Sequence, residues 1–305
     1  MSDKIDIVEV SPRDGFQSVE AFIPTERKLA VLEALYASGL RRIEVTSFVS
    51  ETALPQMNDA ARILHAARAL PGLDSQVLVP NARHAERALA AGADHLSLVV
   101  SASESHNRSN IRKTPQQTVD EFADIKSMTD ASHRIRINVA TAFDCPFEGT
   151  VPSDKVLEII EGALDLWPNA EVALCDTTGR ATPSHVEDVF LVARNRFTPG
   201  RGWAFHGHDT FGLGAANALS AYRAGVRVFD GSAAGLGGCP FAPGATGNTA
   251  TEDLVWMFNG MNVLEGIDMD RLVGAAELIA EIEGAQLGGR VRRALRSRCR
   301  EGQAA

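Results

Sequence analysis

The chain has 305 residues, of which 45% are apolar, and this is enough for one large core or two small domains. Its net charge of −9 and its scattered lysines and arginines argue against the clustered basic surface of a nucleic-acid-binding protein. The four cysteines lie far apart with no C-x-x-C pair, so neither a disulfide framework nor a structural zinc site is indicated.

The first residues, "MSDKIDIVEV", run almost at once into a strand-like segment, without an apolar secretory core or a transit region. A membrane-spanning helix needs about 18 consecutive apolar residues, and no stretch of this sequence approaches that length. We therefore expect a cytoplasmic protein in a reducing compartment, with neither a membrane nor a nucleic acid as partner.

Short β-branched runs alternate with longer segments of helical periodicity along most of the chain. Strands are predicted at 4–10, 41–47, 75–80, 95–101, 134–140, 171–176, 203–208 and 226–232, and helices around 25–38, 55–70, 82–91, 114–131, 153–166, 183–196 and 213–224. In the third helix the apolar residues share one face, and Gly92 can end it before the next strand. Repeated β-α units of this kind predict a parallel sheet.

The number of units favours one α/β architecture. Eight units fit a (β/α)8 TIM barrel, which usually takes about 250 residues, although a doubly wound open sheet remains possible at this level. The region from about residue 250 is predicted to be helical with a basic end. Because no linker marks a boundary, we expect residues 1–305 to form a single catalytic domain, with a barrel over about 4–260 and a helical C-terminal extension over about 261–305 that packs beside it.

Polar residues gather where the predicted strands end, which is where such a barrel carries its chemistry. His206 and His208, in "FHGHDTFG", are two positions apart on the seventh strand, so both side chains leave the same face. Two imidazoles there can hold one ion, whereas a lone histidine is more often solvated or bonded to a backbone carbonyl. Two histidines with oxygen ligands and no thiolate suit Mg²⁺ or Mn²⁺ and do not exclude Zn²⁺ or Co²⁺.

Two further loops carry candidate residues. In "SPRDGFQ", after the first strand, Asp14 can supply a third ligand and Arg13 can serve an anionic substrate, but a structural Arg–Asp pair explains the two equally well. The loop "AGLGGCPFAPGATGN", after the eighth strand, is rich in glycine and proline and carries Cys239 near its middle. This loop is a candidate lid, in which Cys239 is either a reactive group or an inert small residue.

Seven segments together resemble the 3-hydroxy-3-methylglutaryl-CoA lyase family of metal-dependent barrel lyases. They are "VSPRDGFQ", "IEVTSFVS", "ALPQMND", "CPFEG", "FHGHDTFG", "AGLGGCPFAPGATGN" and "TEDLVWM", in the same order and with similar spacing from about residue 5 to about residue 260. Related synthases and aldolases share the barrel and the H-x-H strand. The synthases look different after the eighth strand and usually carry a long C-terminal extension.

The resemblance implies roles residue by residue. The implied metal ligands are Asp14, His206, His208 and Asn248, the catalytic residues are Arg13, Asp14, Glu44, His206 and Cys239, and the substrate-binding residues are Arg13 and Ser47. Arg13 would stabilise the substrate carbonyl and the developing enolate, and Cys239 would be the acid/base of the lid. Glu44 matches a carboxylate that is important for activity in the family.

The reaction that the resemblance implies is cleavage of 3-hydroxy-3-methylglutaryl-CoA, an acyl-CoA substrate, to acetyl-CoA and acetoacetate. It is a divalent-metal-assisted retro-Claisen reaction, with Mg²⁺ or Mn²⁺ as the expected cofactor. We place it in leucine degradation and expect a homo-oligomer, a dimer or higher. The alternatives are the same chemistry on a longer branched or citramalyl-like 3-hydroxyacyl-CoA, a synthase or aldolase of the same superfamily, and a barrel without catalysis.

The chain departs from the family loop at two positions, and a fourth cysteine lies in its tail. Ser11 and Phe16 stand where the family loop usually has glycine and leucine. Phe16, close to Arg13, either changes the shape of the acyl pocket or is a substitution without effect on the substrate. Cys299, near the C-terminus, is expected to be an exposed thiol of the tail.

Overall fold

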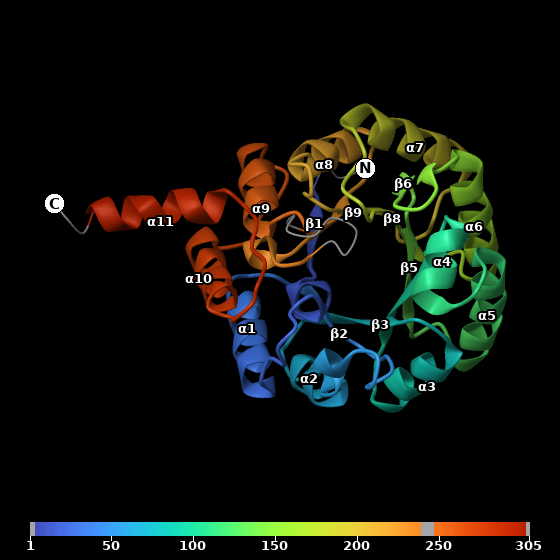
Figure 1. The fold of residues 1–305 in the computed structure, drawn as a ribbon, viewed down its shortest axis with the longest axis horizontal. Coiled ribbons are helices and arrows are strands. Elements are labelled where there is room, and N and C mark those ends of the chain that lie inside the picture. The colour runs from blue at the N-terminus through green and yellow to red at the C-terminus, as the bar shows by residue number, and fades with distance from the viewer. Residues whose placement is uncertain (1–3, 239–246, 303–305) are drawn as a thin grey trace.

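The structure is a computed structural model that describes residues 4–238 and 247–302, with side chains up to residue 296. In this part of the chain, eight parallel strands close into a barrel in the order β1-β10-β9-β8-β5-β4-β3-β2 (Figure 1). They are β1 (Asp6–Glu9), β2 (Arg42–Ser47), β3 (Asp74–Val79), β4 (His95–Ser101), β5 (Arg134–Ala140), β8 (Glu171–Asp176), β9 (Trp203–Gly207) and β10 (Val228–Gly231). Because β1 pairs with β10, the predicted TIM barrel is confirmed and an open sheet is excluded.

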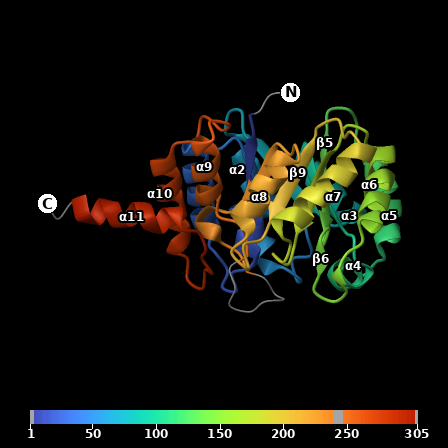
Figure 2. The ribbon, with the colours of Figure 1, turned by 90° about the horizontal axis from the view of Figure 1, so that it is seen from above.

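Helices surround the strands, as Figures 1 and 2 show from two directions. Those that the sequence predicts are α1 (Thr25–Ala37), α2 (Ala60–Arg68), α3 (Ala82–Ala90), α5 (Pro115–Met128), α6 (Ser153–Leu166), α7 (Pro183–Arg196) and α8 (Gly214–Arg223). Side-chain caps start several of them; Thr114 and Gln117 form a reciprocal capping box at α5. Gly92 follows α3 with a φ of 91°, the left-handed conformation that ends a helix at low cost.

Three elements differ from the prediction. The predicted helix 55–70 is a short turn, η2 (Pro55–Met57), followed by α2. A helix, α4 (Glu104–Ile111), and a hairpin of β6 (Asp144–Cys145) and β7 (Gly149–Thr150) were not predicted. The helix α4 is mostly polar and has no apolar periodicity, so its order comes from tertiary contacts. The carboxylate of Glu148 in the hairpin accepts hydrogen bonds from Ser103 Oγ and Ser105 N, both at 2.8 Å, at the start of α4.

Three more helices follow the last strand. The helix α9 (Thr251–Gly260) packs against β10 and β1, and α10 (Met269–Ala280) packs against α1. The last helix, α11 (Val291–Gly302), extends away from the barrel in both views (Figures 1 and 2). Among the helices in the described residues, none combines the length and apolar character needed to cross a membrane.

The barrel has an apolar outside and a polar inside. A large core cluster lies between the strands and the helices, whereas the separate inner cluster is small: Val8, Val10, Ala173, Ala204 and Val228. Charged side chains occupy much of the remaining interior. Among them, Arg136 is 1% exposed and Asp230 is 7% exposed. Buried charges need paired partners, so the interior constrains which polar groups can face one another.

Two buried carboxylates hold the turn η3 (Ala233–Gly235) that follows β10. Glu9 Oε1 accepts from Ala233 N at 2.9 Å, and Glu9 Oε2 accepts from Thr251 Oγ1 at 2.7 Å. Glu252 accepts from Ala234 N at 3.0 and 3.1 Å. Burial, with a further contribution from the charge of Glu9, raises the pKa of Glu252 to about 8. These contacts fix the start of the loop that leads to Gly238.

The carboxyl group of Glu252 is expected to make stability depend on pH. Between its ordinary pKa of 4.5 and its folded pKa of about 8, the folded chain keeps a proton that the unfolded chain releases. The stability that the Glu252 carboxyl group contributes is full below its pKa in the unfolded chain and is lost as pH rises through its pKa in the folded chain. We predict that Glu252→Gln, which cannot ionise, flattens this decline in urea unfolding between about pH 5 and pH 9, whereas the exposed Glu20→Gln does not. Parallel curves for Glu252→Gln and the parent protein would contradict the prediction.

Candidate metal centre

Arg13 and Asp14 lie on one wide helical turn, η1 (Ser11–Gly15), directly after β1. The carbonyl of Val10 accepts from Arg13 N at 3.1 Å, from Asp14 N at 2.8 Å and from Gly15 N at 3.3 Å. The turn therefore closes tightly on the end of the strand. It holds both charged side chains at the carboxyl end of the barrel.

His206 and His208 come from the end of β9 and are both buried. Their ring centroids are 5.2 Å apart, as expected for side chains two positions apart that leave the same face. An isolated antiparallel bridge joins His208 to Asn248, which places the predicted fourth ligand beside the histidines.

Asp14, His206 and His208 form the one group in the described residues in which at least three His, Cys, Asp or Glu side chains can reach a single ion. Their candidate ligand atoms all lie within 4.8 Å of one another. His208 Nε2 is 4.0 Å from Asp14 Oδ2. Two imidazoles and a carboxylate, with no thiolate among them, fit a divalent cation that accepts nitrogen and oxygen ligands. Asn248 contacts this group through its amide nitrogen, which donates to Asp14 Oδ2 at 2.7 Å.

Arg13 balances the charge of the site. Its Nη1 donates to Asp14 Oδ1 and its Nε donates to Glu44 Oε2. Burial raises the pKa of Asp14, but the charges of Arg13 and of the two histidines outweigh burial and hold that pKa well below its usual range. Asp14 is therefore a carboxylate at neutral pH and can bind a cation.

The two histidines have opposite electrostatic environments. Burial lowers the pKa of His206, but its hydrogen bond to Asp230 and the negative charge there raise the pKa above its ordinary value. Burial and the neighbouring His206 lower the pKa of His208 to about 4. His208 is thus neutral near pH 7 and keeps a lone pair for a metal ion.

The other predicted site residues are placed as follows. Glu44 is buried on β2 against Arg13, and Ser47 is buried at the end of the same strand. Ser47 Oγ is buried and has no hydrogen-bond partner in residues 4–238 and 247–302. Cys239 lies outside the described residues, as does the side chain of Cys299.

The position of Phe16 bears on the two readings of that substitution. Its side chain is fully buried in the outer hydrophobic core, which favours a substitution without effect on the substrate over a changed acyl pocket beside Arg13. The turn η1 directs Arg13 and Asp14 toward the site, and Phe16, just after the turn, packs into the apolar layer instead. The nearby Ser11 is buried as well, and its backbone N donates to Glu9 Oε1 at 2.8 Å.

Sequence reasoning missed two charged residues behind the site. His206 Nδ1 lies 3.0 Å from Asp230 Oδ2, and Arg136 Nη2 donates to the same carboxylate at 2.7 and 2.8 Å. The sequence did contain a signal for both residues. Asp230 is a charged residue within the predicted buried strand "VRVFDGS", and Arg136 is one within "RIRINVA". Such a residue must find a partner inside the barrel.

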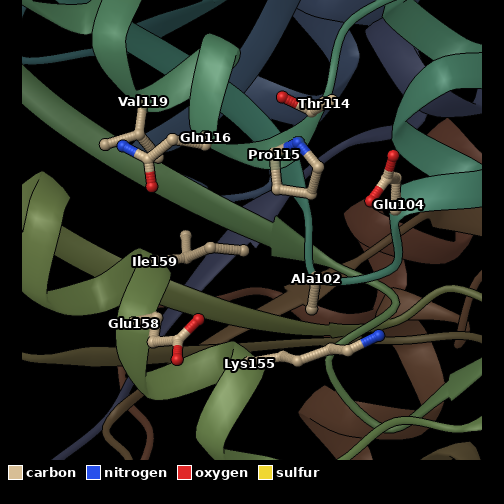
Figure 3. A pocket seen from close by; sticks show the side chains of 9 residues that line it. All are labelled: Ala102, Glu104, Thr114, Pro115, Gln116, Val119, Lys155, Glu158 and Ile159. Atoms are coloured by element: carbon tan, nitrogen blue, oxygen red, sulfur yellow. The ribbon is translucent and has the colours of Figure 1, made fainter.

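Two pockets lie elsewhere on the molecule. One, of about 220 Å³, lies between the start of α5 and α6 and is lined by residues such as Thr114, Pro115 and Lys155 (Figure 3). The other, of about 440 Å³, is lined by Arg42, Asp74 and other residues near the amino ends of strands. Neither is lined by a residue of the metal-ligating group, so they are separate from the site at the carboxyl ends.

The fold and the site define a TIM-barrel protein with a candidate metal centre at the carboxyl ends of its strands. A family model described as HMGL-like matches residues 4–279, and the chain belongs to this family. It is 39% identical over 288 residues to a hydroxymethylglutaryl-CoA lyase of Bacillus subtilis, covering 94% of this chain and 96% of the relative. It is 38% identical over 292 residues to the mitochondrial hydroxymethylglutaryl-CoA lyase of Mus musculus, covering 95% and 89%.

A solved structure shares the same architecture. It is an HMG-CoA lyase from Acinetobacter baumannii in complex with coenzyme A and 3-methylmalate. The TM-score is 0.89 at 37% identity, with 96% of each chain covered. The similarity thus extends over nearly the whole of both chains.

Gly237 is expected to be required for the position of Asn248. Its φ is +153°, and a Cβ there would lie 2.7 Å from Asn248 Nδ2 and 3.2 Å from Asn248 N. We predict that Gly237→Ala displaces Asn248 from Asp14 and weakens Mn²⁺ binding about tenfold, as measured by the electron paramagnetic resonance signal of free Mn²⁺.

The matched control for that variant is Gly266→Ala. Gly266 also has a positive φ, +83°, but a Cβ there meets open space. Both substitutions strain the backbone, and only Gly237→Ala crowds the site. Equal Mn²⁺ affinities for the two variants would contradict the role assigned to Gly237.

Proposed function

We propose that this chain is a carbon–carbon lyase that cleaves 3-hydroxy-3-methylglutaryl-CoA to acetyl-CoA and acetoacetate by a divalent-metal-assisted retro-Claisen reaction. The observation that carries the proposal is the group of Asp14 and the two buried histidines, His206 and His208, with Arg13 beside it. Full-length similarity to lyases named for this reaction supports it.

The cofactor in this proposal is Mg²⁺ or Mn²⁺. Asp14, His206 and His208 would hold it, with Asn248 as a further ligand through its amide oxygen. Once bound, the cation supplies Lewis acidity that lowers the pKa of the substrate hydroxyl. The nitrogen and oxygen donor set supports this choice of ions.

The chain's own residues move the protons and balance the charge. Asp14 accepts the hydroxyl proton, whereas both nitrogens of His206 are engaged, one with the cation and one with Asp230. The oxygen forms the carbonyl of acetoacetate, and the carbon–carbon bond breaks with its electron pair going to the thioester enolate. Arg13, held by Glu44 and Asp14, provides positive charge where the enolate develops, a contact that strengthens in the transition state. Cys239 then protonates the enolate carbon, which releases acetyl-CoA. Ser47, with an unpartnered hydroxyl within the described chain, would bind the acyl portion together with Arg13.

The methylglutaryl group is favoured over other acyl groups. The reason to expect a different acyl pocket was Phe16, whose side chain is buried in the outer core. The solved Acinetobacter baumannii lyase, which holds coenzyme A, supports an acyl-CoA ester as substrate. A longer branched or citramalyl-like ester therefore has no specific observation in its favour.

The broader context of the proposal rests on the sequence. A cytoplasmic location, a role in leucine degradation and assembly as a homo-oligomer stay predictions. We treat residues 1–305 as one catalytic unit, since α10 packs on α1 and the side chain of Arg292 in α11 pairs with Glu277 at 2.8 Å.

The direct test is turnover by metal-stripped protein. We predict that the stripped protein does not form acetoacetate from 3-hydroxy-3-methylglutaryl-CoA and that Mg²⁺ or Mn²⁺ restores turnover. Arg13→Gln and Cys239→Ala should each reduce kcat by about a hundredfold or more while the protein keeps its fold. Glu20→Gln, an exposed change, is the control. Full turnover without metal would contradict the mechanism, and metal binding without cleavage would contradict the substrate.

A further inference from the structure

A line of buried polar contacts runs from the candidate metal centre into the barrel. It begins at His206 on β9, whose Nδ1 lies 3.0 Å from Asp230 Oδ2 on the neighbouring strand β10. His206 and Asp230 are direct partners in the parallel register of these strands, so their side chains share the inner face. The contact is therefore fixed by the sheet itself.

Arg136 continues the line from another part of the barrel. It lies on β5, which is separated from β10 by β8 and β9 in the ring, so its side chain reaches across the interior. Arg136 Nη2 donates to both oxygens of Asp230, at 2.8 and 2.7 Å. Its Nη1 donates to Glu171 at 3.2 Å and its Nε to Asn138 at 2.9 Å. The guanidinium is thus anchored on three sides and holds Asp230 in one orientation.

The orientation of Asp230 decides which nitrogen of His206 faces the site. An ionised carboxylate only accepts hydrogen bonds, so Nδ1 of His206 must carry the proton in this contact. Nε2 is then the nitrogen left for a metal ion, and the ring plane is set by the bond at Nδ1. Without Arg136, Asp230 would be a buried charge lacking its counterion and free to turn.

We propose that Arg136 and Asp230 are positioning residues of the metal centre, in which Arg136 fixes Asp230 and Asp230 fixes His206 with Nε2 directed at the ion. This inference rests on the metal site of the proposed function. It does not depend on which substrate is cleaved. Neither residue touches the reacting atoms in this account, and both act through His206.

The interior also contains a matched control. Arg42 is another largely buried arginine of the same network; it donates to Glu171 at 3.0 and 3.1 Å and to Asp6 at 3.2 Å. It does not contact Asp230 or His206 in the described structure. Loss of Arg42 should therefore affect stability in a similar way without turning His206.

The test measures Mn²⁺ affinity in the absence of substrate, by the paramagnetic resonance signal of free Mn²⁺. Asp230→Asn and Arg136→Met should each weaken binding about tenfold or more, the usual effect of removing a group that orients a metal ligand. Arg136→Lys keeps the positive charge but cannot donate two parallel hydrogen bonds to Asp230. Its Mn²⁺ affinity should therefore lie between those of Arg136→Met and the parent protein. Arg42→Met should bind Mn²⁺ as the parent protein does, even where its melting temperature falls.

A double variant separates positioning from general destabilisation. If Arg136 acts through Asp230, adding Arg136→Met to Asp230→Asn should change Mn²⁺ affinity by less than about twofold, because the link is already broken. If the losses of Mn²⁺ affinity of the two single variants multiply in the double variant, the inference is overturned. Wild-type Mn²⁺ affinity in Asp230→Asn would overturn it as well. If Arg136→Met does not fold, Arg136→Lys and Asp230→Asn carry the same comparison.

Failure of this positioning inference can be told apart from failure of the proposed function. A parent protein that binds Mn²⁺ but does not cleave the CoA ester would refute the proposed substrate and leave the positioning test intact. A parent protein that binds no Mn²⁺ would refute the metal site and this inference together.

Discussion

Asp14 can remain charged inside the protein because Arg13 lies against one of its oxygens and the amide of Asn248 bonds to the other. The rest of the candidate site depends on this carboxylate. It brings together the turn after β1, the end of β9 and the segment that contains Asn248, which are far apart in the sequence. Without its negative charge, Arg13 and the partly protonated His206 would face each other with less compensating charge between them.

The need to pair each buried charge also applies to the rest of the polar barrel interior. A parallel barrel normally fills its interior with branched apolar residues, but here the inner apolar cluster is small and ion pairs occupy much of the space. Such pairs contribute little net stability, since desolvation offsets much of their attraction. The ion pairs instead restrict the arrangement of the interior, because each charged side chain has few possible partners. This restriction holds the histidines in one geometry. Stability comes mainly from the apolar layer between strands and helices.

The fold could be predicted in most of its elements because buried parallel strands and amphipathic helices leave strong periodic patterns. The helix α4 and the hairpin β6–β7 leave none, since both depend on contacts such as those of Glu148 with Ser103 and Ser105. At the site, the spacing of His206 and His208 was informative by itself, because a strand fixes where alternate residues point. Asn248 came only from family resemblance, because a loop has no such periodicity.

The points that the sequence left open or missed concern directions that local sequence does not specify. Phe16 is near Arg13 in the chain, but Phe16 packs in the outer core whereas Arg13 contacts Asp14 and Glu44. Arg136 and Asp230 were passed over because their partners lie on strands distant in sequence, and only barrel closure brings them together. Proximity along the chain was thus a poor guide to the neighbourhood of the site, and strand register was a good one.

The most direct test of the central claim is a crystal structure of the protein with Mn²⁺, located by its anomalous scattering. The account predicts one strong peak about 2 Å from ligand atoms of Asp14, His206 and His208, a distance typical of oxygen and nitrogen ligands. A peak at another place in the barrel, such as beside Asp74 and Glu171 near the amino ends of the strands, with none at the histidines, would contradict it.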